Sequence, residues 1–306
     1  MRPEKELSNT KINLDYFSMA KKINNGNYAP NTLSQKVNLA IRLLRSIPQD
    51  GPVEVSYSGG KDSDVILELA KMAGIPYRAI YKNTTIDPPG TIAHCKSKGV
   101  EIFAPTINFF DLVKTKGCPT RRARFCCEKL KEYKVLDRAI QGIRRHESTA
   151  REKRYKEPEV CREYQNGNAR VYLPILEWTD KDVSEFIAQR GIKCHPLYYD
   201  EEGNFHIERR LGCIGCPLRA DNGKSDFVKY PKMLRQLIRS AHIYLETHPH
   251  VRAVEKFSTA HNMVFHNLFC ESYEQYTDLI TGGLFPETAI DAKAFMENYF
   301  KIDLTI

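Results

Sequence analysis

The sequence predicts an α/β protein: a parallel twisted sheet with helices on both faces, followed by a mostly helical C-terminal part. Short apolar runs alternate with segments of helical periodicity over the first half of the chain. After residue 220 only helical periodicity remains, near residues 225–246 and 288–300. With 306 residues, 42% of them hydrophobic, the chain is long enough to bury a core.

The first elements follow from their periodicity and end signals. Residues 31–46 carry apolar side chains at helical spacing after a Thr/Ser start, which predicts an amphipathic helix. Residues 53–57 form an apolar strand, a glycine loop follows, and a helix then runs to Gly74. The alternation continues with a strand at 77–81, a helix near 90–98, a strand at 100–103 and a helix around 127–136.

The middle of the chain breaks this alternation. Residues 144–170 are rich in charge and poor in apolar side chains, which predicts a mobile loop or lid. Order is expected to resume at Val171, with a helix from Thr179 to about Gln189. We therefore expect an N-terminal helical segment at 1–50, the α/β domain at 51–220 and the helical part at 221–306.

The charge balance favours anionic partners. Lys and Arg number 46 against 38 Asp and Glu, a formal net charge of +8, which suits a nucleotide or a nucleic acid. The first twenty residues contain no apolar stretch typical of a signal peptide, and no run approaches the roughly 18 apolar residues of a membrane span. A cytoplasmic location is expected.

The glycine loop has the composition of a phosphate site. Ser58-Gly59-Gly60-Lys61-Asp62-Ser63 lies between the first strand and its helix, where glycines let the backbone approach an anion and helix amides face it. Lys61 adds a positive charge, and the two serines add hydroxyl donors. A Walker A loop has four residues between its first glycine and its Gly-Lys pair, so this is a different phosphate loop.

The nine cysteines suggest metal or redox chemistry in a reducing compartment. Cys126 and Cys127 are adjacent, and Cys213 and Cys216 form a CxxC pair, so four thiolates could bind zinc or an iron–sulfur cluster. Redox-active or merely structural cysteines remain an alternative. Cys118 could replace one ligand or accept sulfur, although a lone cysteine is more often a buried thiol.

The loop resembles the PP-loop of the adenine nucleotide alpha hydrolase-like (HUP-like) superfamily. Further segments are similar to its phosphoadenosine-phosphosulfate (PAPS) reductase branch, at residues 142–151, 173–180 and 196–198. Residues 83–91 (NTTIDPPGT) are closer to the ATP pyrophosphatases of DNA phosphorothioation. Together the matching segments cover about residues 53–220.

The resemblance implies that ATP binds and that a nucleophile attacks its α-phosphate, which releases pyrophosphate and leaves an adenylated intermediate. Residues 58–63 would hold the β- and γ-phosphates, and Asp62 would contact Mg²⁺. Lys61, Arg144 and Arg151 would stabilise the developing charge. A tandem cysteine pair with a distant CxxC resembles the ligation of adenylylsulfate reductases and implies a 4Fe-4S cluster on Cys126, Cys127, Cys213 and Cys216.

Three functions stay open on the sequence. The first is an adenylating sulfur transfer, with a cysteine desulfurase as sulfur donor and DNA as a candidate acceptor. The second is PAPS or adenylylsulfate reduction, although the family's Glu-Cys-Gly-Leu-His segment is missing and Cys270 is the only cysteine after Cys216. The third is a nucleotide-binding sensor without catalysis, which would bind ATP without releasing pyrophosphate.

Overall fold

The computed structural model describes residues 32–164 and 166–306 and divides into two compact units. Unit 1 takes the chain up to Lys82, then Pro89–Phe103 and Tyr133–Leu211; unit 2 takes Asn83–Pro88, Ala104–Glu132 and Gly212–Ile306. The units therefore interleave along the sequence. The three expected segments, 1–50, 51–220 and 221–306, stay a prediction, and the part before residue 32 lies outside the described residues.

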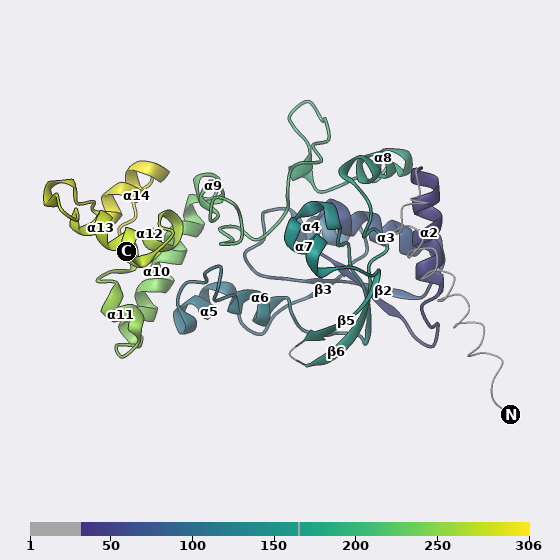
Figure 1. The fold of residues 1–306 in the computed structure, drawn as a ribbon, viewed down its shortest axis with the longest axis horizontal. Coiled ribbons are helices and arrows are strands. Elements are labelled where there is room, and N and C mark those ends of the chain that lie inside the picture. Colours follow the sequence, from purple (N-terminus) through teal and green to yellow (C-terminus); the bar gives the residue numbers. More distant parts are fainter. Residues whose placement is uncertain (1–31, 165) are drawn as a thin grey trace. The chain divides into compact units, whose positions relative to one another are not determined.

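A six-stranded sheet forms the centre of unit 1 (Figure 1). Its order is β3-β2-β1-β4-β6-β5, and every neighbouring pair is parallel except β5 and β6. This confirms the predicted α/β class, with one antiparallel strand added at an edge. The strands are β1 (Val53–Tyr57), β2 (Tyr77–Lys82), β3 (Glu101–Phe103), β4 (Arg138–Ile140), β5 (Glu159–Tyr164) and β6 (Gly167–Tyr172).

Helices α2 (Leu33–Arg45), α3 (Lys61–Ala73) and α8 (Asp180–Arg190) pack against one another in unit 1. Their apolar side chains share a core with alternate residues of β1, namely Val53, Val55 and Tyr57. Helix α2 begins after the capping box of Thr32. Helix α3 ends at Gly74, which adopts the left-handed conformation as expected. Helix α4 (Thr91–Ser97) and the short 3-10 helix η2 (Pro196–Tyr198) also belong to this unit.

The prediction of a mobile loop or lid at 144–170 is wrong. The segment contains the 3-10 helix η1 (Arg145–Glu147), helix α7 (Thr149–Arg154), and the hairpin of β5 with β6. Strand β5 lies at the sheet edge, so its charged side chains can point to solvent, and its low apolar content misled the sequence reading.

The predicted helix at 127–136 is also misplaced. Helix α6 covers only Phe125–Leu130, and α5 (Phe109–Lys116) precedes it, capped by the side chain of Asn108. The chain after α6 leads directly to β4, which the sequence reading missed because the strand is only three residues long.

Unit 2 is helical, as predicted for the C-terminal part, but it also includes α5 and α6 from the middle of the chain. Helix α10 packs against α5 and α12, and α12 packs against α14, with Leu234, Ile238 and Phe265 in the shared core. Within the described ranges no helix has both the length and the hydropathy of a bilayer span. The later helices are α9 (Lys224–Lys229), α10 (Pro231–Thr247), α11 (Arg252–Lys256), α12 (Ala260–Phe269), α13 (Tyr273–Thr281) and α14 (Ala292–Phe300), with the 3-10 helix η3 (Pro286–Thr288) before α14.

Candidate functional site

The phosphate loop lies where the order of the sheet reverses. From β1 the chain proceeds to β2 and β3 on one side, and β4 then pairs with β1 on its other side. Open α/β sheets bind ligands at such a reversal point, beside the carboxyl ends of the strands. The loop after β1 is residues 58–60, and the loop after β4 carries Arg144.

The surroundings of Gly59 require a glycine. It has φ of +79°, and a Cβ there would lie 3.0 Å from Leu211 Cδ2 and 3.1 Å from Thr91 Cγ2. Gly60 is the N-cap of α3 and supplies no capping side chain. The Ser63 and Asp64 amides donate to its carbonyl and the Lys61 amide donates to the Tyr198 hydroxyl, so in this turn the Asp62 amide has no partner recorded among the described residues and is open to an anion.

The loop serines and Lys61 are held close to the backbone. The Ser63 hydroxyl donates to the Gly60 carbonyl at 2.6 Å and lies 3.3 Å from the Ser58 hydroxyl. Lys61 is 5% exposed, and its Nζ lies 3.5 Å from Asp62 Oδ2. The ammonium group therefore lies within the loop and is shielded from bulk solvent.

Arg144 is placed beside the loop, and its partners are carboxylates. Its Nε donates to Asp62 Oδ1 at 2.8 Å and its Nη2 to Asp180 Oδ1 at 2.8 Å, while the side chain is only 2% exposed. Its Nη1 also lies 3.4 Å from the Trp178 carbonyl. In this arrangement Arg144 joins the first turn of α3 to the start of α8.

Arg151, in α7, pairs with Glu147, one turn earlier. Its side chain is 42% exposed, so it is open to solvent where Arg144 is not. The two arginines named by the sequence therefore differ: Arg144 braces Asp62, whereas Arg151 keeps an accessible guanidinium.

Tyr198 is a loop contact that sequence reasoning missed. Its hydroxyl accepts hydrogen bonds from the amides of Lys61 and Leu211, both at 3.3 Å, and Lys61 Nζ lies 5.5 Å from the centre of its ring. Burial raises the pKa of Tyr198 to about 12, so the phenol is neutral at pH 7. The 196–198 segment was recognised as family-like, but nothing in its composition indicates that it returns to the loop.

Asp62 does not fit as a free magnesium ligand in this arrangement. Arg144 occupies Oδ1 and Lys61 lies near Oδ2, so both oxygens already face cations. Across the described ranges no three His, Cys, Asp or Glu side chains are arranged to bind a metal ion. We therefore assign Mg²⁺ no step through this carboxylate.

The four predicted cluster ligands come together inside unit 2. Cys126 and Cys127 in α6 and Cys213 and Cys216 in the loop before α9 (Lys224–Lys229) line one cavity of about 30 Å³, with Lys131 among its other walls. Gly215 has φ of +67°, and a Cβ there would overlap the ring of Phe227. Tight packing behind the CxxC loop thus fixes its path.

The surroundings favour a thiolate at Cys127. A hydrogen bond with Cys126 lowers the pKa of Cys127, helped by Arg124, and the same bond raises the pKa of Cys126. Burial raises the pKa of Cys213. Burial opposes the charge of Lys131, but Cys213 and other nearby groups outweigh that effect and raise its pKa. A buried ammonium group therefore faces the sulfur atoms.

The donor set fits a 4Fe-4S cluster in its chemistry: four sulfur atoms from two segments line one cavity beside a buried cation. It fits zinc equally in ligand type. The thiols are not in a ligating arrangement, since no group of three meets metal geometry among the described residues. Iron and zinc analysis of the purified protein distinguishes the two metals.

The remaining candidate thiols are packed away. Cys118, Cys194 and Cys270 are all buried, at 7%, 5% and 7% exposure. Burial raises the pKa of Cys118 to about 12 and that of Cys270 to about 11, and it also raises the pKa of Cys194. Such thiols are poor nucleophiles near neutral pH.

Three histidines, His195, His206 and His242, have polar partners within the described residues. His195 is fully buried and accepts from the Leu197 amide at Nδ1, and burial lowers its pKa to about 4. His206 contacts Asp200 and Glu208. His242 pairs with Glu246 one turn later.

A glycine-rich loop between β1 and α3, at the reversal point of a mostly parallel sheet, is typical of PP-loop proteins of the adenine nucleotide alpha hydrolase-like superfamily. Residues 52–219, more than half of the chain, match the phosphoadenosine phosphosulfate reductase domain family, and the chain belongs to that family. This family match confirms the resemblance that residues 58–63 indicated in the sequence. No comparison distinguishes the phosphorothioation branch.

Several curated proteins are similar over part of their length. An uncharacterised 37.8 kDa protein of Escherichia phage 186 is 36% identical over 39% of this chain and 38% of its own length. An uncharacterised protein of Methanocaldococcus jannaschii is 32% identical over 54% of this chain and 41% of its own. Sulfate adenylyltransferase subunit 2 of a Shewanella strain is 28% identical over 53% of this chain and 66% of its own length. The chain thus spans about two fifths of the first two relatives.

The similar solved structures have low TM-scores and low sequence identity to this chain. A phosphoadenylyl-sulfate reductase from Candida auris, in a phosphate complex, has a TM-score of 0.42 and 15% identity over 61% of this chain and 96% of that one. The FMN adenylyltransferase of Candida glabrata has a TM-score of 0.39 and 16% identity over 68% of this chain and 71% of that one. At these values the likeness carries no argument about fold or function.

Proposed function

We propose that the protein is an ATP pyrophosphatase that adenylates an acceptor for sulfur transfer. The observation that carries the proposal is the start of α3: Gly60 supplies no capping side chain, the Asp62 amide has no partner recorded among the described residues, and Lys61 adds a shielded positive charge. This suits the charged oxygens of a triphosphate. Membership of the reductase domain family supports an enzyme that handles adenine nucleotides and sulfur.

The proposed reaction has three balanced steps. An acceptor oxygen attacks the α-phosphorus of ATP, the bond from that phosphorus to the bridging oxygen breaks, and pyrophosphate leaves. A persulfide sulfur delivered by a cysteine desulfurase then attacks the acceptor atom that bears the adenylated oxygen, and AMP leaves with that oxygen. A thiol finally reduces the mixed disulfide. In the first step Lys61 and the α3 amides would stabilise charge on the phosphoryl oxygens.

Burial of the spare thiols favours this reaction over sulfonucleotide reduction. A reductase of this type needs a cysteine that attacks sulfur, and Cys118, Cys194 and Cys270 are buried with raised pKa values. Reduction remains the second candidate because the family match favours it.

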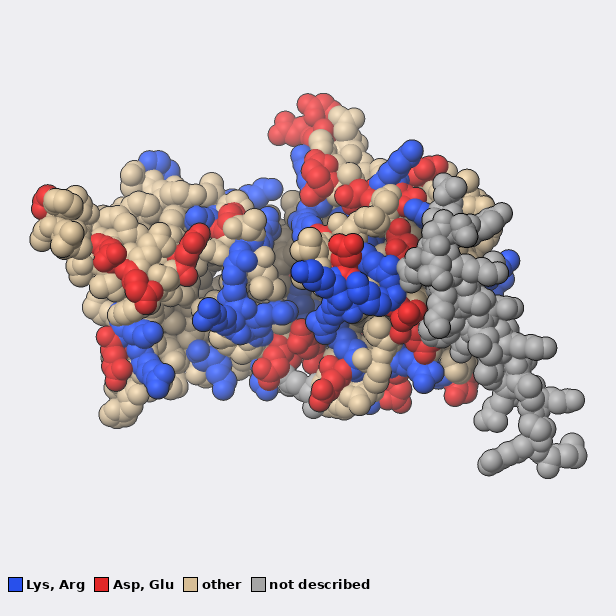
Figure 2. All heavy atoms as spheres, viewed as in Figure 1, with Lys and Arg blue, Asp and Glu red and all other residues tan. Residues whose placement is uncertain are grey.

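A nucleic acid is the proposed acceptor. Figure 2 shows Lys and Arg side chains gathered over α7, which carries Arg151, Lys153 and Arg154. Lys153 and Arg154 have no ion pair recorded among the described residues, so their charge is open to phosphates. DNA is the acceptor we would test first.

Cys126, Cys127, Cys213 and Cys216 would hold the 4Fe-4S cluster. When bound, such a cluster supplies one-electron redox chemistry or a structural anchor. Lys131 and Arg124 would balance its negative charge. Iron and zinc analysis of anaerobically purified Cys213→Ser should show loss of iron, while Cys161→Ser, an exposed cysteine in β5, should retain it. If Cys213→Ser retains as much iron as the wild type, Cys213 is not a ligand. If the wild type contains zinc and no iron, the four cysteines bind zinc and not a cluster.

The deciding experiment measures pyrophosphate release from ATP beside sulfite release from PAPS and adenylylsulfate with a thiol reductant. Wild type should release pyrophosphate, faster with DNA, and no sulfite. Lys61→Ala should lose this release, while Lys181→Ala, an exposed lysine on α8, should keep it. Sulfite release would establish the reductase instead, and ATP binding without pyrophosphate would indicate the non-catalytic sensor.

A further inference from the structure

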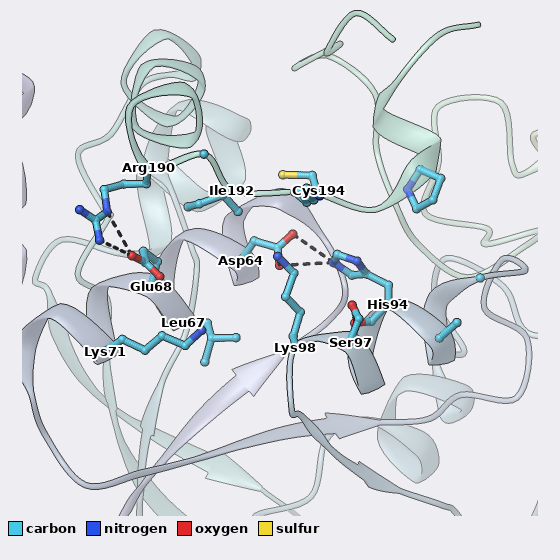
Figure 3. A pocket seen from close by; sticks show the side chains of 15 residues that line it. Asp64, Leu67, Glu68, Lys71, His94, Ser97, Lys98, Arg190, Ile192 and Cys194 are labelled. Carbon is cyan, nitrogen blue, oxygen red and sulfur yellow. Dashed lines mark hydrogen bonds and ion pairs between the residues drawn. The ribbon is translucent and has the colours of Figure 1, made fainter.

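Unit 1 has a second cavity outside the phosphate loop. It has a volume of about 630 Å³ and lies between α3, α4 and the segment 190–196 (Figure 3). None of residues 58–63 lines it. We call it the α3–α4 pocket. Its volume falls within the roughly 300–1,000 Å³ typical of small-molecule sites.

A buried carboxylate forms the floor of this pocket. Asp64 is 2% exposed and accepts a hydrogen bond from the Tyr57 hydroxyl at 2.6 Å. His94 Nε2 lies 3.2 Å from its Oδ2, and Lys98 Nζ lies 3.6 Å from its Oδ1. Its negative charge is therefore matched from several sides, so Asp64 is not left to attract a cationic ligand.

The rim carries a surplus of positive charge. Four basic residues line the pocket against two acidic ones. Arg190 is bound to Glu68 through its Nε at 3.1 Å and its Nη2 at 2.7 Å, which satisfies the second carboxylate. Lys71 and Lys193 have no ion pair recorded among the described residues, so their charges are available to an anion.

Leu67, Ala93, Ile192 and Pro196 add apolar side chains to the lining, beside the polar side chains of His94 and Ser97. These apolar side chains suit a carbon framework, whereas a bare inorganic ion would leave most of their surface in water. The pocket therefore combines apolar side chains with cations at its edge.

We propose that the α3–α4 pocket binds a phosphate-bearing organic molecule of mononucleotide size. The phosphate contacts Lys71 and Lys193, and the organic part covers Ala93 and Ile192. Lysine is a point charge that suits phosphate groups. The site is separate from the triphosphate position at residues 58–63, and so it can be filled while ATP is bound.

The pocket also has a direct link to the phosphate loop. Tyr57 immediately precedes Ser58, and Asp64 immediately follows Ser63, so the hydrogen bond between Tyr57 and Asp64 spans the loop. A ligand that draws Lys98 away from Asp64 would change the partners of that carboxylate. Binding at the two sites would then be coupled, and the coupling would be equal in both directions.

The test is calorimetric titration of the full chain with adenosine 5′-monophosphate, after a non-hydrolysable ATP analogue has saturated the phosphate loop. Binding should persist under saturation. Lys71→Ala should weaken it about fivefold and Lys71→Ala/Lys193→Ala about twentyfold, since each exposed charge contact contributes modestly. Lys96→Ala, an exposed lysine on α4 that does not line the pocket, should leave it unchanged.

Each other outcome overturns the proposal. Absence of binding rejects this ligand class for the pocket. Loss of binding under saturation by the ATP analogue places the probe at the phosphate loop. Equal affinity in wild type and in the double variant means that the probe binds elsewhere. Lys71 and Lys193 are exposed, so their removal should not disturb folding, and circular dichroism checks this. The result is independent of pyrophosphate release, which tests the phosphate loop.

Discussion

Replacing Arg144 by alanine tests whether this arginine braces the phosphate loop or serves as a free phosphate ligand. The guanidinium is 2% exposed and holds Asp62 and Asp180, both at 2.8 Å. Arg144→Ala would leave Asp62, itself only 16% exposed, without its nearest cation on Oδ1. We therefore expect a loss of stability as well as of nucleotide binding.

The size of that loss follows from the exposure of each partner. A charged hydrogen bond contributes roughly 1.5–3 kcal/mol, and we take about 2 kcal/mol for the shielded contact with Asp62. The contact with Asp180, which is 62% exposed, contributes under about 1 kcal/mol because water screens it. Together they give about 3 kcal/mol, or a drop of roughly 6–12 °C in the melting midpoint for a unit of this size.

Differential scanning calorimetry should resolve this shift. Arg144→Lys should lower the melting midpoint by about half as much, since one ammonium group cannot bridge two carboxylates. Arg170→Ala, which removes an arginine that is 60% exposed, is the control and should move the midpoint by no more than about 2 °C. If Arg144→Ala matches that control while its affinity for ATP falls, Arg144 is a phosphate ligand and the bracing role is wrong.

Three further changes test other parts of the molecule. Gly59→Ala should cost about 1–2 kcal/mol in backbone strain and weaken ATP binding at least tenfold, measured by calorimetric titration; unchanged affinity would show that the loop tolerates a side chain. Gly215→Ala should make unit 2 sensitive to limited proteolysis, whereas Gly212→Ala, where a Cβ meets nothing within 4 Å, should not. The carboxylates around His206 raise its pKa, so its stabilising charge is complete below about pH 6.5 and is lost as the pH rises through the folded-state value. NMR titration should find that Asp200→Asn lowers this pKa; an unchanged value would mean that the contact is absent in solution.

The phosphate loop could be predicted because its information is local. Two glycines, a lysine and two serines between an apolar strand and a helix-period segment define backbone path, charge and donors together. The structure places strand β1 and helix α3 where that pattern indicates. The four cysteines line one cavity, and their role as cluster ligands stays a prediction.

The supports of the loop depend on strand order, which the sequence does not display. Arg144 reaches Asp62 because β4 pairs with β1, and those segments lie more than eighty residues apart. Tyr198 returns to the Lys61 amide across 137 residues. The resemblance named Arg144 as a phosphate-site cation, but its contact with Asp62 and the contact of Tyr198 with the loop become visible only once the sheet is assembled.

Errors in the element assignments have a different cause. At β5, charged residues occupy an edge strand, so the usual link between low apolar content and disorder fails there. Helix α5 was missed because its apolar side chains, including Phe109 and Leu112, pack against a helix that comes much later in the chain.

That separation has a consequence during synthesis. Helix α5 leaves the ribosome more than a hundred residues before α10, against which it packs, and translation adds only about 5–20 residues per second. For several seconds Phe109, Leu112 and Val113 have none of their α10 contacts, while the strands of unit 1 that flank them can already pair. A nascent chain stalled before residue 231 should therefore recruit chaperones through residues 109–116, and release of α10 should end that recruitment.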